Sequence, residues 1–315
     1  MHTTHRGLQP REAATLGLLS AVWGASFLFI KVAVDDVGPV GVAVSRLVLA
    51  TATIGGWLLL RRGPAGVRAM LRGIRPADAV LFAATGSAMP FLLIAWAETR
   101  ITSSLAGILN ASIPLMTAGL ALYLGTPDRI RGWRSAGLLL GFGGVALVAG
   151  GQLSGQPAGV AAMLVAALGY SASAHVARRR FAAVEPQAVA LVQVGVGLLL
   201  VLPALALDPP STTPSGQAVA ALVALGVGGT GFAYFLYYSL VSTAGPQHAV
   251  AVTYLVPVAA VIYGRVFLDE HVSAGALVGM ALILAGQVVT SIPSRRPLAT
   301  PRPSAASIAG LPENA

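Results

Sequence analysis

The sequence predicts an all-α polytopic membrane protein in which ten transmembrane helices form two inverted five-helix repeats. Three observations support this fold class: the composition, the spacing of the apolar runs and an internal repeat. Of the 315 residues, 56% are hydrophobic and 10% are charged, whereas a soluble domain is about 25% charged. One soluble core could not hide so many apolar side chains. Since one crossing takes about 20 apolar residues, we expect about ten crossings joined by short connections.

Apolar runs bounded by charged or by glycine- and proline-rich breaks define the expected helices in order. They cover residues 14–33, 40–60, 77–98, 101–122, 134–151, 157–177, 187–206, 217–241, 246–267 and 273–291. The first run is too long for the apolar region of a signal peptide and lacks a small-residue cleavage site, so we expect it to stay in the mature protein. Residues 1–13 are expected to form a polar cytoplasmic tail, and residues 292–315, rich in Pro, Ser, Ala and Arg, a disordered cytoplasmic tail.

The distribution of cationic residues predicts the orientation in the membrane. Ten spans put both termini on one side, and sixteen of the twenty Lys and Arg residues then fall in segments on that side. Cytoplasmic segments are enriched in Lys and Arg, so both termini are expected to be cytoplasmic. The sixteen are Arg6, Arg11, Arg61, Arg62, Arg68, Arg72, Arg75, Arg129, Arg131, Arg134, Arg178, Arg179, Arg180, Arg295, Arg296 and Arg302.

An internal repeat relates residues 14–151 to residues 157–291, with five expected helices in each half. A shift of 147 residues places Trp23 on Tyr170, Lys31 on Arg178, Pro39 on Pro186 and Arg46 on Gln193; a shift of 143 places Gly86 on Gly229 and Pro114 on Pro257. Because five is odd, the second half enters the membrane from the opposite side. Inverted repeats are typical of secondary transporters, whose substrate sites lie near the midplane between the halves.

Several motifs in their order along the chain resemble those of one transporter family. They are WGASFLFIK at 23–31, P-x6-R at 39–46, IPLMTAGLALYLG at 113–125, YLVPVAAVIYG at 254–264, LDE at 268–270 and GMALILAG at 279–286. With these motifs the chain resembles the drug/metabolite transporter superfamily, specifically the EamA-type bacterial permeases. The resemblance implies a bacterial inner-membrane exporter of amino acids, related metabolites or toxic compounds. This chain departs from the family pattern at Thr126, where a Glu is common, so that Glu270 has no acidic counterpart.

Corresponding helices of the two halves contain glycine- and proline-rich interruptions near mid-membrane. In the first half these are Gly86 and Pro90, and in the second Gly226, Gly228, Gly229 and Gly231. Such residues weaken a helix and free backbone groups that a cavity can satisfy, and paired interruptions point to a transport site. Close helix packing by glycine is the alternative interpretation. The GxxxG patterns at Gly137 and Gly141 and at Gly275 and Gly279 predict close helix contacts, which join either the two halves or two copies of the protein.

Candidate substrate-binding residues combine cations with aromatic and polar side chains at helix depth: Trp23, Lys31, Arg46, Trp96, Asn110, Tyr170, Gln193, Tyr234, Tyr238 and Tyr254. An Arg within a span is costly to expose to lipid, so Arg46 is expected to face protein or water and to receive a substrate carboxylate. A structural ion pair with Glu98, Asp35 or Asp36 is the alternative. Lys31 lies near a helix end and can snorkel. Each aromatic residue can instead be a packing or interfacial residue.

Missing motifs, the net charge and the positions of acidic residues exclude several classes of function. The chain has no cysteine, and it lacks the metal motif H-E-x-x-H and the nucleophile motif G-x-S-x-G, so we expect no enzyme activity, metal or cofactor. The net charge of +9 is explained by loop orientation rather than by nucleic acid. No acidic residue is expected deep in a span, which argues against proton coupling through a buried carboxylate. We predict an exporter of amino acids or similar small polar metabolites; drug efflux and a non-transporting scaffold are the alternatives.

Overall fold

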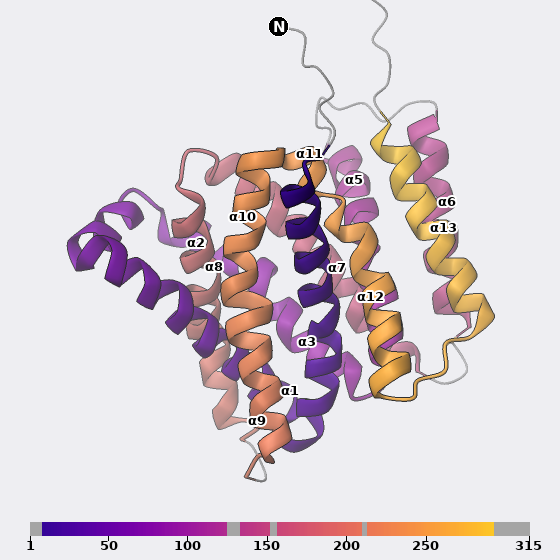
Figure 1. Cartoon of the computed structure of the whole chain (residues 1–315), viewed down its shortest axis with the longest axis horizontal. Helices are drawn as coiled ribbons and strands as arrows, with labels where there is room; N and C mark the ends of the chain where they lie inside the picture. Colours follow the sequence, from indigo (N-terminus) through magenta and orange to yellow (C-terminus); the bar gives the residue numbers. More distant parts are fainter. Residues whose placement is uncertain (1–7, 125–132, 152–155, 210–212, 293–315) are drawn as a thin grey trace, which may run out of the picture.

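The computed structural model describes residues 8–124, 133–151, 156–209 and 213–292, and within these ranges every regular element is helical. Residues 1–7 of the predicted N-terminal tail and residues 293–315 of the predicted C-terminal tail lie outside the described residues. Most helices run side by side, and the start of the first helix and the end of the last lie at the same end of the bundle (Figure 1). We call this the terminal end, and the other the opposite end. The all-helical fold class predicted from the sequence is therefore confirmed.

The first helix, α1 (Pro10–Leu71), contains two of the predicted spans. Its 62 residues correspond to about 90 Å of helix, three times the thickness of the hydrocarbon core. The backbone leaves helical geometry at Gly38, with φ of 69°, and at Gly63, with φ of 66°. Each glycine precedes a proline, which disfavours helical geometry in the residue before it, and glycine accepts a positive φ without strain. After Gly38 the chain turns back across the bundle (Figure 1).

The remaining helical elements follow α1 along the chain. They are α2 (Pro76–Ala83), η1 (Ala84–Ala88), α3 (Met89–Glu98), α4 (Ser103–Asn110), α5 (Ile113–Tyr123), α6 (Trp133–Gly150), α7 (Pro157–Arg180), α8 (Pro186–Val201), η2 (Leu202–Ala206), α9 (Gly216–Val223), η3 (Ala224–Phe232), α10 (Ala233–Ala244), α11 (Pro246–Ala249), α12 (Val252–Phe267) and α13 (Ala274–Ser291). Among the described residues, eight continuous helical stretches are long and apolar enough to cross a membrane, and α12 is a shorter apolar helix.

Two segments, η1 and η3, are wound as π-helices inside otherwise α-helical stretches. Gly86 lies in η1, and Pro90 follows it in α3; Gly226, Gly228, Gly229 and Gly231 lie in η3. Pro90 has no N–H to donate to the Gly86 carbonyl four residues earlier. A π-turn shifts the hydrogen bonding by one residue and is frequent at functional sites. These segments give the two halves matching irregularities.

The last helices of the two halves, α6 and α13, pack against each other along their length (Figure 1). Glycines face backbone on both sides: a Cβ on Gly144 would lie 2.6 Å from the Gly279 carbonyl oxygen, and one on Gly137 would lie 2.8 Å from the Thr290 nitrogen. Gly275 has no such neighbour. Small residues let backbones approach in this way, so this contact joins the two halves of one chain.

Candidate substrate cavity

A cavity of about 370 Å³ lies between the two halves. Both halves contribute to its wall, through α1, α3, α4 and α5 on one side and α7, α8, η3, α10, α11 and α12 on the other. The residues that line it are Trp23, Ser26, Phe27, Ile30, Arg46, Phe91, Ile94, Asn110, Ala111, Ile113, Tyr170, Gln193, Gly229, Thr230, Tyr234, Tyr237, Ala249, Val250, Thr253, Val256 and Pro257. The wall is thus mainly apolar and aromatic, with a few polar groups.

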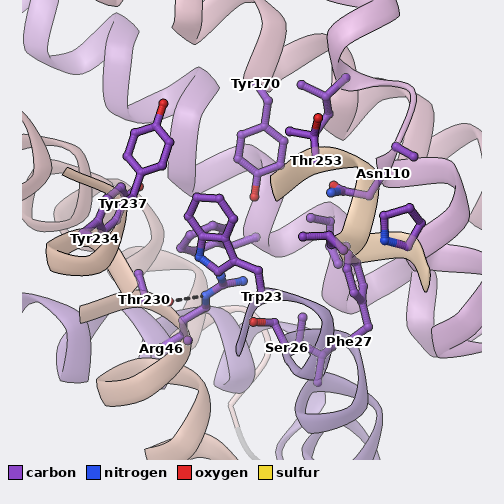
Figure 2. A pocket seen from close by; sticks show the side chains of 18 of the residues that line it. Trp23, Ser26, Phe27, Arg46, Asn110, Tyr170, Thr230, Tyr234, Tyr237 and Thr253 are labelled. Atoms are coloured by element: carbon purple, nitrogen blue, oxygen red, sulfur yellow. Dashed lines mark hydrogen bonds between the residues drawn. The ribbon is translucent and has the colours of Figure 1, made fainter. Parts of the chain in front are cut away.

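Arg46 is the one charged side chain among the described residues that line the cavity. It is 9% exposed, and its Nε donates a hydrogen bond of 2.8 Å to the Thr230 hydroxyl (Figure 2). The guanidinium carbon lies 3.7 Å from the centroid of the Phe91 ring. In the part of the chain that the structure describes, no carboxylate forms an ion pair with Arg46. The predicted alternative, a structural ion pair with an acidic residue, is therefore not found there.

Gln193, the repeat counterpart of Arg46, makes the corresponding contact in the other direction. Its Nε2 donates a 2.6 Å hydrogen bond to the Gly86 carbonyl, the group that Pro90 leaves without a helical donor. Ser87 donates to the Gln193 carbonyl at 2.7 Å. The repeat equates Gly86 with Gly229, next to Thr230. Each half therefore extends a side chain to the π-helical segment of the other half, with a cation in one contact and a neutral amide in the other.

The structure brings together six of the ten predicted binding residues at the cavity: Trp23, Arg46, Asn110, Tyr170, Gln193 and Tyr234. Figure 2 shows five of these six, with Tyr170 and Asn110 pointing toward the space beside Trp23. The other four lie outside the cavity wall. Lys31 bonds to backbone carbonyls, Trp96 stacks under Arg100, Tyr238 stacks on Tyr234, and Tyr254 bonds to Ser291.

Sequence reasoning missed several cavity residues, of which Thr230, Phe91 and Tyr237 matter most. Thr230 orients Arg46, Phe91 covers its face, and Tyr237 lies 5.6 Å from Trp23 between ring centroids. Thr230 could have been predicted from the sequence, because it lies in the glycine-rich interruption and its repeat counterpart is Ser87. Nothing in the sequence distinguishes Phe91 from the other apolar residues of its helix.

A second hollow of about 430 Å³ continues the cavity toward the terminal end, and we call it the vestibule. It is lined by the end of α7 and the start of α8, including Phe181 and Val184. Four residues line both spaces: Tyr170, Gln193, Tyr234 and Tyr237. These side chains form the boundary between the cavity and the vestibule.

Polar contacts gather at the opposite end, where α3 meets α4. The Lys31 ammonium donates to the backbone carbonyls of Glu98 at 2.6 Å and Ile101 at 3.4 Å. The Glu270 carboxylate accepts hydrogen bonds from the backbone N–H groups of Ser103 and Ser104, at 2.7 and 2.9 Å, and from both hydroxyls. Acceptors at a helix N-terminus satisfy its free N–H groups. Glu270 thereby ties the second half to the first.

A comparison with protein families places this architecture. The model described as the EamA-like transporter family matches residues 12–150 and again residues 157–292. The chain belongs to the EamA-like transporter family. The two matches fit an architecture of two repeats, and they confirm the family that the motifs predicted.

Relatives of this EamA-like transporter extend over nearly its full length. A Streptantibioticus cattleyicolor protein named "Probable terminal-alkyne amino-acid exporter" is 29% identical over 91% of this chain and 96% of its own. The uncharacterised inner membrane transporter YedA of Escherichia coli K12 is 25% identical over 91% and 92%. A protein of known crystal structure aligns with a TM-score of 0.64 at 22% identity, covering 90% of this chain and 98% of its own, which shows a shared fold.

The family, these names and the apolar helices agree on a coarse function. The EamA-like transporter is a multi-pass inner-membrane protein that moves a small-molecule substrate within a lipid environment. The comparisons support a transporter rather than an enzyme. They do not identify the substrate or the residues that bind it.

Proposed function

We propose that this transporter exports amino acids or related small polar metabolites that bear a carboxylate, by alternating access through the central cavity. The observation that supports this most is Arg46, a buried guanidinium on the cavity wall whose partners are a hydroxyl and an aromatic ring. A buried charge is costly unless it is paired. A substrate carboxylate is the partner that this environment lacks.

The geometry of the Arg46 side chain suits a carboxylate. A guanidinium carries five N–H donors in a fixed fork that matches carboxylate oxygens. Within the described chain, Nε alone has a hydrogen-bond partner, the Thr230 hydroxyl, so the terminal nitrogens are available. The Phe91 ring covers one face of the group and leaves its donating edge free. Arg46 is thus held in place and still able to bind.

The rest of the wall suits the other parts of a small zwitterion. The Tyr170 hydroxyl and the Asn110 side-chain carbonyl are acceptors that an amino group can use, and both residues line the cavity. Apolar side chains such as Phe27, Ile30 and Val256 surround the remaining space. A volume of about 370 Å³ lies at the lower end of the range for small-molecule sites. The relative named as an amino-acid exporter supports the same substrate class.

We place ten crossings in the bilayer, with the terminal end in the cytoplasm. The kink at Gly38 divides α1 into two apolar crossings, and α11 and α12 together supply the crossing that α12 alone is too short to make. Arg178 and Arg180 lie in the last turn of α7, and Arg62 lies in α1 beside its second kink at Gly63, as expected for cytoplasmic ends of crossings. The vestibule then connects the cavity with the cytoplasm.

Counterflow in proteoliposomes tests the proposal. The vesicles are loaded with a pool of unlabelled amino acids and other carboxylate metabolites, and the entry of labelled members is followed. We expect saturable entry with the wild type and at least a tenfold loss with Arg46→Ala, since a charge-assisted pair is worth about 1.5–3 kcal/mol. Arg61→Ala, an exposed cation on the same helix, is the matched control and is expected to transport normally.

Three results contradict the proposal. Full transport of carboxylates by a folded Arg46→Ala protein removes Arg46 from the binding site. Failure of the whole pool, together with saturable transport of lipophilic cations, assigns the protein to drug efflux instead. Failure of both substrate classes favours a scaffold.

A further inference from the structure

The side chain of Glu98 is buried without a hydrogen-bond partner in the described chain. Glu98 ends α3 at the opposite end of the bundle and is 0% exposed. Neither carboxyl oxygen has a hydrogen-bond partner among the described residues. The Lys31 ammonium donates to the backbone carbonyl of Glu98 rather than to its carboxyl group.

Glu270, the other carboxyl group in this region, shows what an ionised side chain requires there. It accepts hydrogen bonds from two backbone N–H groups and two serine hydroxyls, enough to replace the water that a carboxylate loses on burial. Glu98 has none of these donors. A buried carboxylate without donors is far costlier than the neutral acid, so the Glu98 environment fits a carboxyl group that holds a proton.

Burial is the strongest influence on Glu98 and favours its neutral form, and the charged groups around it act in both directions. Lys31 and Arg46 from α1 and Glu270 from the connection before α13 act on it electrostatically, two attractive and one repulsive. Helix α7 packs on this region through Gly159, which faces Ala97, Arg100 and Ile101, and it has no charged side chain before its last turns. The Arg100 guanidinium lies over the Trp96 ring. Helix α4 has none at all. The two cations are engaged elsewhere, by backbone carbonyls and by Thr230.

We propose that Glu98 is a proton-binding site that locks the opposite end of the cavity closed. In the closed conformation the carboxyl group keeps its proton and Lys31 is held by the carbonyls of Glu98 and Ile101. When this end opens, the O–H bond of Glu98 breaks, the proton passes to the outer solution, and the Lys31 ammonium leaves the carbonyls and pairs with the carboxylate. The ligand is therefore a proton from the outer solution. This inference rests on the proposed alternating access and orientation, and not on the identity of the substrate.

The direction of the pH effect follows from proton counting. The closed conformation holds one proton more than the open one, so external acid favours closure and external alkali favours opening. Linkage of one proton limits the change to about tenfold per pH unit in the ratio of open to closed protein. Neutral Glu98→Gln mimics the protonated state and removes the dependence.

Accessibility of a single cysteine measures the opening without any substrate. The chain has no cysteine of its own, so Ile94→Cys, one turn before Glu98 on the cavity wall, is the only reactive thiol. Intact cells are treated with a membrane-impermeant maleimide at external pH from 6 to 8. Labelling of Leu207→Cys, 89% exposed and expected on the outer surface, corrects for the reactivity of the thiol itself and tests the orientation.

We expect corrected labelling of Ile94→Cys to rise several-fold from pH 6 to pH 8, and to become independent of pH when Glu98→Gln is added. Glu185→Gln, which removes an exposed carboxylate paired with Arg62 at 2.9 Å, is the matched control and should keep the pH response. A pH response that persists in Glu98→Gln, or that is absent from the wild type, overturns the proposal. Silent counterflow with pH-dependent labelling rejects the proposed substrate and keeps the proton site.

Discussion

At the scale of single residues, the two contacts that cross between the halves differ in charge. Arg46 donates to Thr230, and Gln193 donates to the Gly86 carbonyl. Both contacts satisfy a π-helical segment, since Thr230 in turn donates to the Leu225 carbonyl at 3.1 Å. Only the Arg46 contact adds a charge to the cavity. The two contacts are thus related by the repeat, but only one of them supplies a charged group for binding.

Gln193→Leu tests the structural half of this pair. The substitution leaves the Gly86 carbonyl without a donor next to Pro90, and an unpaired buried acceptor costs about 1–3 kcal/mol. We therefore expect a lower thermal unfolding temperature in detergent. Gln156→Leu, at an exposed position before α7, is the control and should unfold at the wild-type temperature. Equal temperatures for both variants indicate that water or another group satisfies the Gly86 carbonyl.

Residue chemistry predicted part of the site and left out the rest for identifiable reasons. The cost of an arginine in lipid placed Arg46 inside the protein, and the repeat led from it to Gln193. The roles of the aromatic residues were harder to predict, because nothing in the sequence distinguishes Tyr234 at the cavity from Tyr254, which bonds to Ser291. Glu98 was expected near the outer face, but the sequence did not show that its side chain is fully buried, since burial at a helix end depends on neighbouring segments.

At the scale of helices, the close approach of α6 and α13 depends on individual glycines. Gly143 and Gly144 are adjacent, but a Cβ on Gly143 meets nothing within 4 Å, whereas one on Gly144 meets the Gly279 carbonyl oxygen and the Ile283 nitrogen. Backbone atoms cannot move aside as a side chain can. The two positions therefore form a matched pair for testing the contact.

We expect Gly144→Ala to destabilise the protein by about 1–3 kcal/mol through overpacking, and Gly143→Ala to be neutral or slightly stabilising because alanine favours helix. Thermal unfolding of the two purified variants measures the difference. If Gly144→Ala is as stable as Gly143→Ala, the helices separate at little cost and the contact is looser than the structure shows.

Helix positions followed from the sequence more closely than helix geometry did. Apolar runs predicted 157–177 where α7 spans Pro157–Arg180, and 273–291 where α13 spans Ala274–Ser291. The π-winding of η1 and η3 was beyond prediction, because glycine and proline indicate where a helix is weak and not how it is rewound. The sequence shows Gly38 and Gly63 only as loop positions. It therefore did not predict that α1 is one helical stretch with kinks at these two glycines.

At the scale of the molecule, composition and the inverted repeat were enough to predict the fold class, and the family match agrees. Orientation depends on the positive-inside count alone, so it needs its own test. Trp133→Cys, at the start of α6, is expected in the cytoplasm, and Leu207→Cys outside; both positions are exposed, at 49% and 89%. Impermeant maleimide on intact cells should label Leu207→Cys and reach Trp133→Cys only after lysis. The reverse pattern inverts the proposed topology and the direction of transport.

The glycine contact between α6 and α13 also leads us to expect that these two helices stay together while the cavity-lining helices move. Within the described chain neither helix contributes a side chain to the cavity or the vestibule, and their backbones touch too closely to slide. We therefore expect the pair to serve as a fixed support during the proposed alternating access. A probe attached to an exposed side chain of this pair, at Leu139 or Val278, is then expected to leave transport unchanged.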